Sequence, residues 1–416
     1  MQKLTNPILP ALIESQLQDS VWAATEAVCH QTTKRILNAF IEHKVGEEHF
    51  FSVSGYGHDD LGREVMDKVF AQSLQAEAAI VRPQIVSGTH AIATALRGLL
   101  KPGNHLVSLT GHPYDTLEEV IGLRGHSSQS LIQQGVHYHE LNVFSSSPSH
   151  TSGLDFSQLD PDILKQASVF FIQRSRGYSS ERPSLTIAQI SALCQCVKDI
   201  NPEATVMVDN CYGEFTEATE PTMVGADLIA GSLIKNPGGG IVPTGGYIAG
   251  RKWAVQAASE ALTCPGIGPE GGYTFDLTRT ILQGLFMAPM IVKEAVKGMQ
   301  FAAKLFSDLG LQVSPSWQAP RSDIIQLIHL ETPERLIQFC TALQQKSPVH
   351  AYVSPVPDQV PGYESQVVMA GGTFIEGATI ELSADGPLRP PYTVFLQGGL
   401  NYAHTRLALL HVAENI

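Results

Sequence analysis

From about residue 64 the chain alternates between two hydrophobic patterns. In one, apolar residues recur every three or four positions, which is typical of a helix with one buried face; in the other, short apolar runs are bounded by Gly, Pro, Asn or Asp, which is typical of strands. Helical spacing is found at 64–76, 89–100 and 185–200. Strand-like runs occupy 78–87, 105–110, 136–143, 168–174, 204–210, 226–233 and 244–250. This rhythm predicts βαβ units, and therefore a mainly parallel seven-stranded sheet covered by helices.

The segments that flank this region differ from it. Residues 13–48 have helical spacing and predict an N-terminal extension of the kind that often lies across a partner subunit. Residues 266–289 open with Gly and Pro, become helical, and are interpreted as the exit from the large domain; 290–310 predicts a long helix. Further strands are expected near 324–330, 373–382 and 392–398. The predicted division is an arm, a large domain and a smaller α+β domain, at residues 1–60, 61–290 and 291–416.

Composition indicates a large folded protein with a sizeable core, because 43% of the 416 residues are hydrophobic and only 16% are charged. The net charge of −13, without any run of basic residues, argues against binding to nucleic acid. No apolar stretch is long enough to predict a membrane span, and the N-terminal residues lack the apolar core of a signal peptide. We therefore expect a cytoplasmic protein whose six scattered cysteines are reduced.

Two residues indicate the chemistry: one lies near the end of a strand-like run, and the other lies just after the next run. The run 204–210 contains Asp209 near its end, and Lys235 follows the run 226–233. A carboxylate against a pyridine nitrogen keeps it protonated and makes the ring an electron sink, while a lysine amine holds an aldehyde as a Schiff base. Either residue alone would be read as a turn aspartate or a solvated lysine. Together they indicate the chemistry of pyridoxal phosphate (PLP).

The residues around this pair supply a phosphate site and a turn. Gly88 and Thr89 stand between a strand expected to end at Val86 and an Ala-rich helix, and a helix N-terminus attracts a phosphate through its free N–H groups and its dipole. An ordinary N-cap is the alternative interpretation. Lys235 is followed by Asn, Pro and three glycines, which predicts a sharply turned loop that could hold the amine in place. A nucleotide P-loop is excluded because these glycines follow the lysine.

Six sequence blocks spread over residues 52 to 400 resemble one family of PLP enzymes. They read SGYGHDDLGREVMDKVFA, VSGTHAI, QRSRGYSSERPSLTI, VDNCYGEF, GSLIKNPGGGIVPTGGYIAG and SADGPLRPPYTVFLQGGL. They are similar to the methionine gamma-lyase and cystathionine beta-lyase branch of the fold-type I enzymes, and within it to the "aluminium resistance" group. The resemblance implies the fold-type I transferase-like α/β class, with seven strands in the large-domain sheet.

The resemblance also implies site residues. Ser232 matches a hydroxyl residue that holds the phosphate just ahead of the lysine, and Tyr114 matches an aromatic residue that stacks on the pyridine ring and assists proton transfer, with His112 as its rival. Tyr56 matches a tyrosine that reaches into the neighbouring subunit's phosphate site and toward the substrate. Here the family's Tyr-x-Arg becomes Tyr-Gly-His, with the arginine delayed to Arg63, so that residue is a doubtful phosphate ligand.

Arginines complete the expected substrate site. The family's asparagine beside the cofactor's phenolic oxygen is missing after the run 168–174, and Arg174 or Arg176 is the candidate to bind that oxygen or a substrate carboxylate; an ion-paired loop is the alternative. For the substrate α-carboxylate the C-terminal part offers Arg389, in a proline-rich loop, and Arg406, on an amphipathic helix and therefore the poorer candidate.

The expected function is a PLP-dependent carbon–sulfur lyase that acts by β- or γ-elimination on cystathionine, cysteine or methionine, as a homodimer or homotetramer. The alternatives are aldolase or aminotransferase chemistry on the same scaffold, or a PLP-binding protein with little catalysis. No metal site is predicted. His137 and His139 would share one face of a strand, but a pair without further converging ligands is more typical of a sheet than of a metal centre.

Overall fold

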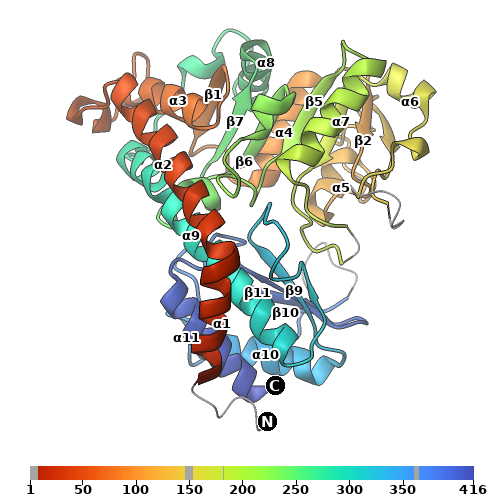
Figure 1. The fold of residues 1–416 in the computed structure, drawn as a ribbon. Helices are drawn as coiled ribbons and strands as arrows, with labels where there is room; N and C mark the ends of the chain where they lie inside the picture. Colours follow the sequence, from red (N-terminus) through yellow and green to blue (C-terminus); the bar gives the residue numbers. More distant parts are fainter. Residues whose placement is uncertain (1–7, 146–152, 181, 360–364) are drawn as a thin grey trace.

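The computed structural model describes residues 8–145, 153–180, 182–359 and 365–416. Figure 1 shows two bodies, an upper one built on β1 to β7 and a lower one built on β8 to β12. Helix α1 lies along the lower body, α2 lies along the upper body, and α9 extends along both. Within these described ranges, no helix is both long enough and apolar enough to cross a membrane.

The upper body contains the predicted seven-stranded sheet, in the order β1-β7-β6-β5-β4-β2-β3. Its strands are β1 (Ala78–Arg82), β2 (His105–Ser108), β3 (His137–Glu140), β4 (Val169–Gln173), β5 (Thr205–Asp209), β6 (Leu228–Ser232) and β7 (Gly246–Gly250). The five strands from β2 to β6 are mutually parallel, whereas β7 is antiparallel to both of its neighbours. The prediction of a mainly parallel sheet is confirmed.

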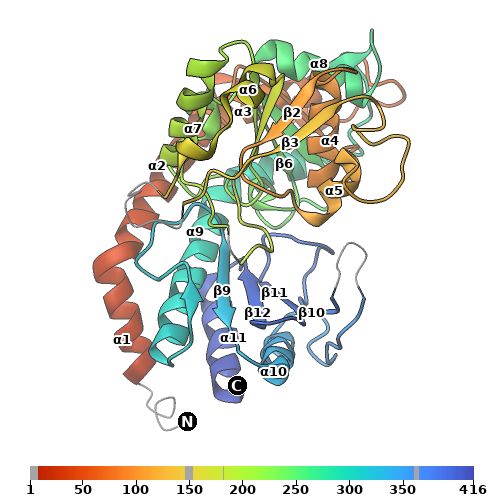
Figure 2. The same ribbon diagram turned by 90° about the vertical axis from the view of Figure 1, so that its right-hand side faces the viewer.

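Helices cover both faces of this sheet, which explains why its central strands are apolar without alternation. In β5, Val206 and Val208 pack on one side with α3 and α7, while Met207 packs on the other with α4 and α8. Figure 2 shows α7 and α4 on opposite sides of the strands. The covering helices are α3 (Leu61–Ser73), α4 (Gly88–Leu99), α5 (Asp115–Ile121), α6 (Pro161–Gln166), α7 (Ile187–Ile200) and α8 (Lys252–Leu262).

The lower body is an antiparallel five-stranded sheet in the order β10-β11-β12-β9-β8, packed against helices. Its elements are β8 (Val313–Ser314), β9 (Ile325–His329), β10 (Val367–Ala370), β11 (Ser383–Pro387), β12 (Thr393–Gln397), α10 (Pro333–Gln344) and α11 (Tyr402–Asn415). The strands expected near 324–330 and 392–398 are therefore confirmed. The strand expected at 373–382 is wrong, because that segment forms a loop between β10 and β11.

A buried carboxylate explains this loop. Both oxygens of Glu381 accept backbone hydrogen bonds, from the N–H of Phe374 at 2.9 Å and from that of Ile375 at 3.0 Å. Gly377 has φ +111°, a conformation that residues other than glycine rarely adopt. The segment therefore folds back on its own acid instead of extending into a sheet. The loop reaches the upper body, where the N–H of Ile380 donates to the carbonyl of Ile234 at 3.3 Å.

Long helices join the two bodies. The predicted N-terminal extension forms α1 (Ile8–Leu17), a π-turn (Gln18–Trp22) and α2 (Ala23–Glu42). Apolar residues of α1 pack in the lower core and those of α2 in the upper core. The segments 266–289 and 290–310, predicted as an exit and a separate helix, share one continuous helix, α9 (Thr278–Asp308), which passes through Pro289. The division of the chain into three domains stays a prediction.

Candidate functional site

The candidate site lies at the carboxyl end of the parallel strands, where Asp209 is the last residue of β5. Its side chain is buried and accepts a hydrogen bond from the N–H of Cys211 at 3.1 Å. Burial raises the pKa of this carboxyl group, while the hydrogen bonds from Cys211 and the charge of Lys235 act in the opposite direction. Among the described residues Asp209 forms no ion pair. A bound cation would therefore stabilise this buried carboxylate.

Lys235 lies three residues beyond β6, next to that acid. Its Nζ is 3.8 Å from the centre of the Tyr212 ring and donates a hydrogen bond to the carbonyl of Ala378 at 2.8 Å. The Tyr212 hydroxyl donates to the same carbonyl at 3.2 Å. Burial acts to lower the pKa of Lys235, but the neighbouring acidic groups, led by Tyr212 and including Asp209, outweigh it and leave that pKa raised.

The predicted turn after Lys235 is confirmed, and it explains how the amine is held. Residues Asn236–Gly238 form a single 3₁₀ turn, and the next two glycines, Gly239 and Gly240, have φ of 55° and 76°. The Asn236 amide donates to the carbonyls of Tyr212 at 3.0 Å and Glu214 at 2.9 Å. This contact ties the loop after β5 to the loop after β6, and so fixes Lys235 relative to Asp209.

The N-terminus of α4 borders the same site. The preceding strand ends at Arg82 and not at Val86 as predicted, because Pro83 lacks an N–H group and the chain turns there, with the N–H of Ile85 bonded to Arg82 O. Ser87 caps the helix by accepting the N–H of His90 at 3.1 Å. The cap is therefore the residue before the predicted pair, and the first two helical N–H groups have no partner among the described residues.

Gly88, the first residue of α4, allows close approach to the other strands. A Cβ atom at this position would lie 3.1 Å from Cys211 Sγ and 3.4 Å from Ser232 Cβ, which is tighter than most real contacts. Thr89 comes next in the helix, and Ser232 is the last residue of β6. The helix N-terminus and both predicted hydroxyl residues thus border the space next to Asp209.

Tyr114 is joined to this group by its hydroxyl. It donates a hydrogen bond to Thr89 Oγ1 at 3.0 Å, and the hydroxyls of Thr89 and Thr116 are 2.8 Å apart. Burial, and then the charge of Asp209, raise the pKa of Tyr114 well above its usual value, so this hydroxyl stays protonated at neutral pH. Its rival His112 lies exposed, bonded to Glu118 and Glu140, while the predicted stacking role of Tyr114 stays a prediction.

Tyr56 lies apart from these residues. Its side chain is 83% exposed and contacts the His58 ring at 5.8 Å between centroids. Arg63, by contrast, is buried and donates to the carbonyl of Gly57 at 2.5 Å and to that of Glu270 at 2.8 Å. Arg63 therefore holds two loops together, which agrees with the doubt about it as a phosphate ligand.

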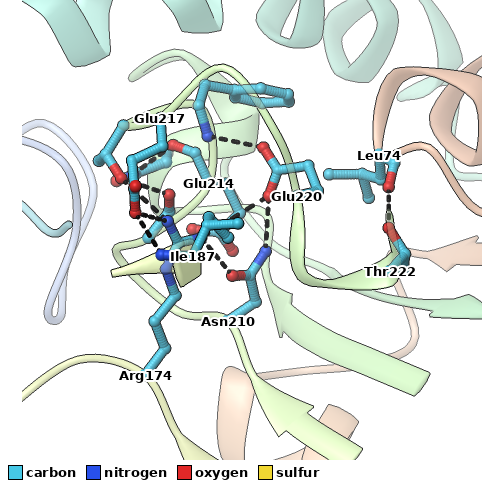
Figure 3. A network of polar contacts seen from close by, with 12 residues as sticks. Leu74, Arg174, Ile187, Asn210, Glu214, Glu217, Glu220 and Thr222 are labelled. Atoms are coloured by element: carbon cyan, nitrogen blue, oxygen red, sulfur yellow. Dashed lines mark hydrogen bonds and ion pairs between the residues drawn. The ribbon is translucent and has the colours of Figure 1, made fainter. Parts of the chain in front are cut away.

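Arg174 belongs to a buried polar network behind the site, shown in Figure 3. It donates to Asn210 Oδ1 at 2.8 Å and to Glu217 at 3.1 Å, and it lies 3.7 Å from Glu220. Glu220 also accepts a bond from Arg35 of α2 at 3.5 Å. Of the two interpretations of Arg174, the structure favours the ion-paired one: its guanidinium fixes the chain after β5 and does not face Lys235.

We expect Arg174→Ala to lower the free energy of unfolding by about 3–5 kcal/mol, because it leaves buried carboxylates without their partner. Arg389→Ala removes an exposed guanidinium without an ion pair among the described residues, and should change stability by about 0.5 kcal/mol or less. Urea unfolding of both variants provides the measurement. Equal stabilities would contradict the structural role given to Arg174.

The other arginines after β4 are also engaged. Arg176 donates to Ser314 Oγ at 3.0 Å and to the carbonyl of Arg182 at 3.2 Å, so its predicted contact with substrate competes with a bond to the lower sheet. Arg182, which the sequence reasoning missed, is bonded to backbone carbonyls; burial lowers its pKa to about 10, and the charge of Asp209 opposes that shift. Among the arginines of this loop, Arg182 is the one whose charge acts on Asp209.

The two C-terminal candidates differ clearly. Arg389 is exposed and lines a small pocket together with Tyr178 and Phe395. Burial raises the pKa of Asp115, which follows Tyr114 in the chain. The positive charge of Arg389 acts in the opposite direction but does not outweigh burial. Arg406 is bonded to Glu14 of α1 at 2.8 Å. The role of Arg389 in binding the α-carboxylate stays a prediction.

Comparison with known proteins gives the family. The sequence profile named methionine gamma-lyase matches residues 11–416. The chain belongs to the methionine gamma-lyase family. A Listeria monocytogenes structure named as a candidate cystathionine beta-lyase involved in aluminium resistance is 44% identical to this family member, with a TM-score of 0.93 over 100% of both chains. A Clostridium novyi structure named as a carbon-sulfur lyase involved in aluminium resistance is 41% identical, with a TM-score of 0.92 over 99% and 96% of the chains.

A more distant structure bears on the fold alone. The methionine gamma lyase of Micromonospora echinospora is 17% identical and aligns with a TM-score of 0.55 over 85% of this chain and 87% of its own. Together with the seven-stranded sheet, this similarity confirms the fold-type I class. The suspected "aluminium resistance" group is confirmed as well, by the names of the two similar structures.

Proposed function

We propose that this member of the methionine gamma-lyase family is a PLP-dependent carbon–sulfur lyase acting on a sulfur-containing amino acid. The observation that carries the proposal is the buried Asp209 carboxylate, which has no ion pair within the described ranges, at the end of β5, with the Lys235 amine just beyond the neighbouring parallel strand β6. A protonated pyridine nitrogen is the cation that this acid lacks. The relatives named for lyase activity support the reaction class.

The residues around the pair fit PLP. The free N–H groups of Gly88 and Thr89, with the hydroxyl of Ser232, would hold the phosphate, and the absence of a side chain at Gly88 lets the helix N-terminus lie close to Ser232 and Cys211. Asp209 would keep the pyridine nitrogen protonated, and Lys235 would bind the aldehyde. When bound, PLP supplies an electron sink for the negative charge that develops at the substrate Cα.

The protein's own groups would then move the protons. Lys235, held over the Tyr212 ring, would remove the proton from Cα once its amine is free. Tyr114, whose raised pKa keeps its hydroxyl protonated, would assist proton transfer at the substrate, and Thr89 and Thr116 orient that hydroxyl. The bond broken lies between carbon and sulfur, and the sulfur leaves as a thiol.

The test is product analysis. Purified protein supplied with PLP and with cystathionine, cysteine or methionine should consume water and release ammonia and a thiol or sulfide together with pyruvate or 2-oxobutyrate. Pyruvate marks β-elimination and 2-oxobutyrate marks γ-elimination. Transamination without release of sulfur, or retro-aldol cleavage, would replace the proposal with one of the other reactions of this scaffold, and a loaded protein that is inactive on every amino acid tested would contradict it.

We further propose a homodimer in which Tyr56 completes the phosphate site of the other chain. The high exposure of this aromatic side chain supports the idea, and two-fold dimers are the commonest oligomers of soluble enzymes. Mixing inactive Lys235→Ala chains with inactive Tyr56→Phe chains should restore part of the activity, since one site of each mixed dimer carries neither change. A monomeric active species in sedimentation, or no recovery after proven subunit exchange, would refute the shared site.

A further inference from the structure

The part-buried amine of Lys235 is held by uncharged groups. Its Nζ lies 3.8 Å from the centre of the Tyr212 ring and donates a hydrogen bond to the carbonyl of Ala378 at 2.8 Å. Among the described residues this amine forms no ion pair. An aromatic face and a carbonyl oxygen both attract a cation although neither carries a net charge. We call the Tyr212 ring and the Ala378 carbonyl the amine dock.

Both bodies of the protein contribute to the amine dock. Tyr212 belongs to the loop after β5 in the upper body, and Ala378 belongs to the loop between β10 and β11 in the lower body. The Tyr212 hydroxyl donates to the same Ala378 carbonyl at 3.2 Å, so the phenol and the amine share its two lone pairs. Close to Ala378, the N–H of Ile380 donates to the carbonyl of Ile234 at 3.3 Å. This bond fixes the lower loop beside the lysine.

The backbone at Tyr212 is held in an uncommon conformation. Its φ of 67° lies in the left-handed region, which is unfavourable for a residue with a Cβ atom. The carbonyl of Tyr212 accepts a hydrogen bond at 3.0 Å from the amide of Asn236, the residue that follows the lysine. Only 7% of Tyr212 is exposed. Strained residues of this kind cluster at functional sites, so the position of this ring next to the amine calls for a functional explanation.

The amine dock suits an ammonium ion better than a neutral amine. Burial by itself lowers the pKa of Lys235, but the groups around the amine, led by Tyr212, leave that pKa raised. Burial raises the pKa of Tyr212, so its hydroxyl is neutral at neutral pH and its ring attracts a cation through the negative face. The other titratable groups that interact with the charge of Lys235 are Cys211, Asp209 and Asp385.

We propose that Tyr212 is a positioning residue whose ring stabilises the ammonium ion that forms when Lys235 takes the proton from the substrate Cα. The inference rests on the proposed function. In this step the Cα–H bond breaks and an Nζ–H bond forms, while the electron pair stays with the substrate and its electron sink. Positive charge therefore develops at Nζ, where the ring face and the Ala378 carbonyl are already in place. Such preorganised groups lower the barrier because they need not reorient during the reaction.

Fluorination of the ring tests the dock without changing its shape. Tyr212→Phe keeps the negative ring face, whereas pentafluorophenylalanine at the same position reverses the charge of that face. Labelling of PLP-free protein with a trace of acetic anhydride over a series of pH values, read by peptide mass spectrometry, gives the pKa of Lys235. This pKa should be lower by about 1 in the fluorinated protein than in Tyr212→Phe. Equal values would contradict the dock.

A matched control uses an exposed ring. Tyr352 is 86% exposed, and placing phenylalanine or pentafluorophenylalanine there should leave the pKa of Lys235 unchanged. The labelling is specific to the lysine's own contacts, because a general loss of stability would not distinguish two rings of the same shape. A shift of the same size from the Tyr352 pair would show that the effect does not come from contact with the ring, and would also contradict the dock.

Turnover of the loaded protein tests the effect on the reaction. With cysteine as substrate, kcat should be about threefold to tenfold lower in the fluorinated protein than in Tyr212→Phe, since the forming ammonium ion loses its attraction to the ring. The isotope effect for cysteine deuterated at Cα should be larger, because proton removal then limits the rate more. A misfolded fraction lowers kcat and leaves the isotope effect unchanged. The same kcat and isotope effect in both proteins would refute the role of Tyr212.

The labelling experiment separates this inference from the proposed function, because it requires neither PLP nor substrate. If the pKa of Lys235 falls as expected, but wild-type protein releases sulfur from none of cystathionine, cysteine and methionine, the lyase function fails and the dock stands. If the wild-type protein is an active lyase and Lys235 has the same pKa with both rings at position 212, only the dock fails.

Discussion

Lys235→Ala is expected to abolish turnover, with a loss of roughly 10³-fold or more, because this amine both binds the aldehyde of PLP and removes the Cα proton under the proposed function. The purified wild-type protein should be yellow, and borohydride should fix the cofactor to the chain through Lys235. The variant should bind PLP without any reducible covalent link. Peptide mass spectrometry after reduction measures this link directly, independently of activity.

A matched control is available on α8. Lys252 is exposed at the start of that helix, and Lys252→Ala should retain both turnover and the reducible link. Lys235→Ala should also remain folded, because the structure gives its amine one hydrogen bond, to Ala378, and one contact with the Tyr212 ring. A cofactor fixed by borohydride to the Lys235→Ala chain would show that another residue holds the aldehyde.

Asp209→Asn is expected to lower kcat by about 10²–10³-fold while PLP remains bound, since a neutral amide cannot keep the pyridine nitrogen protonated. Asp209→Glu, which keeps the charge but moves it, should lose less activity than Asp209→Asn. Steady-state kinetics at saturating PLP, with the cofactor content measured in the same samples, provides the comparison. Wild-type turnover in Asp209→Asn at normal cofactor content would exclude the electron-sink role.

We also predict how Asp209→Asn changes the stability of the folded chain. Burial raises the pKa of Asp209 above its unfolded value, so ionisation of this carboxyl group destabilises the PLP-free folded chain; this cost declines as pH falls below the raised pKa and is gone below the unfolded pKa. Asp209→Asn without PLP should therefore be at least as stable as the wild type at pH 7. Thermal unfolding of wild type and variant over a series of pH values checks the sign. A large destabilisation at pH 7 would show that the charge supports the fold itself.

The local hydrophobic pattern was sufficient to predict segments that share the same surroundings in the fold. Apolar runs bounded by turn residues located the seven strands of the large sheet, because both faces of that sheet are covered and each strand must be apolar throughout. The ends of those strands then placed Asp209 and Lys235 together, since parallel strands present their carboxyl ends on one edge. Where a local rule was broken, as by Pro83 after β1, the predicted end of the strand was wrong.

The local sequence pattern could not predict contacts between segments that are distant in the chain. Arg174, Arg176 and Arg182 stand within nine positions of one another, and their roles differ only because one faces the Glu220 network, one faces Ser314 and one faces the site. The segment 373–382 has the composition of a strand, but Glu381 folds it into a loop. The spacing of residues in the sequence does not distinguish the roles of these arginines, nor does it distinguish this loop from a strand.

The sequence by itself determined the fold class, the parallel sheet and the pair Asp209 and Lys235, because hydrophobic periodicity and strand-end chemistry are properties of single segments. Only the tertiary structure decided which groups surround the lysine. Tyr212 has φ of 67°, an uncommon conformation for a residue other than glycine, and the carbonyl of Ala378, which accepts a hydrogen bond from Lys235, lies more than a hundred residues further along the chain. Their positions depend on the packing of two bodies against each other, and that packing is set by many weak contacts that no single segment encodes.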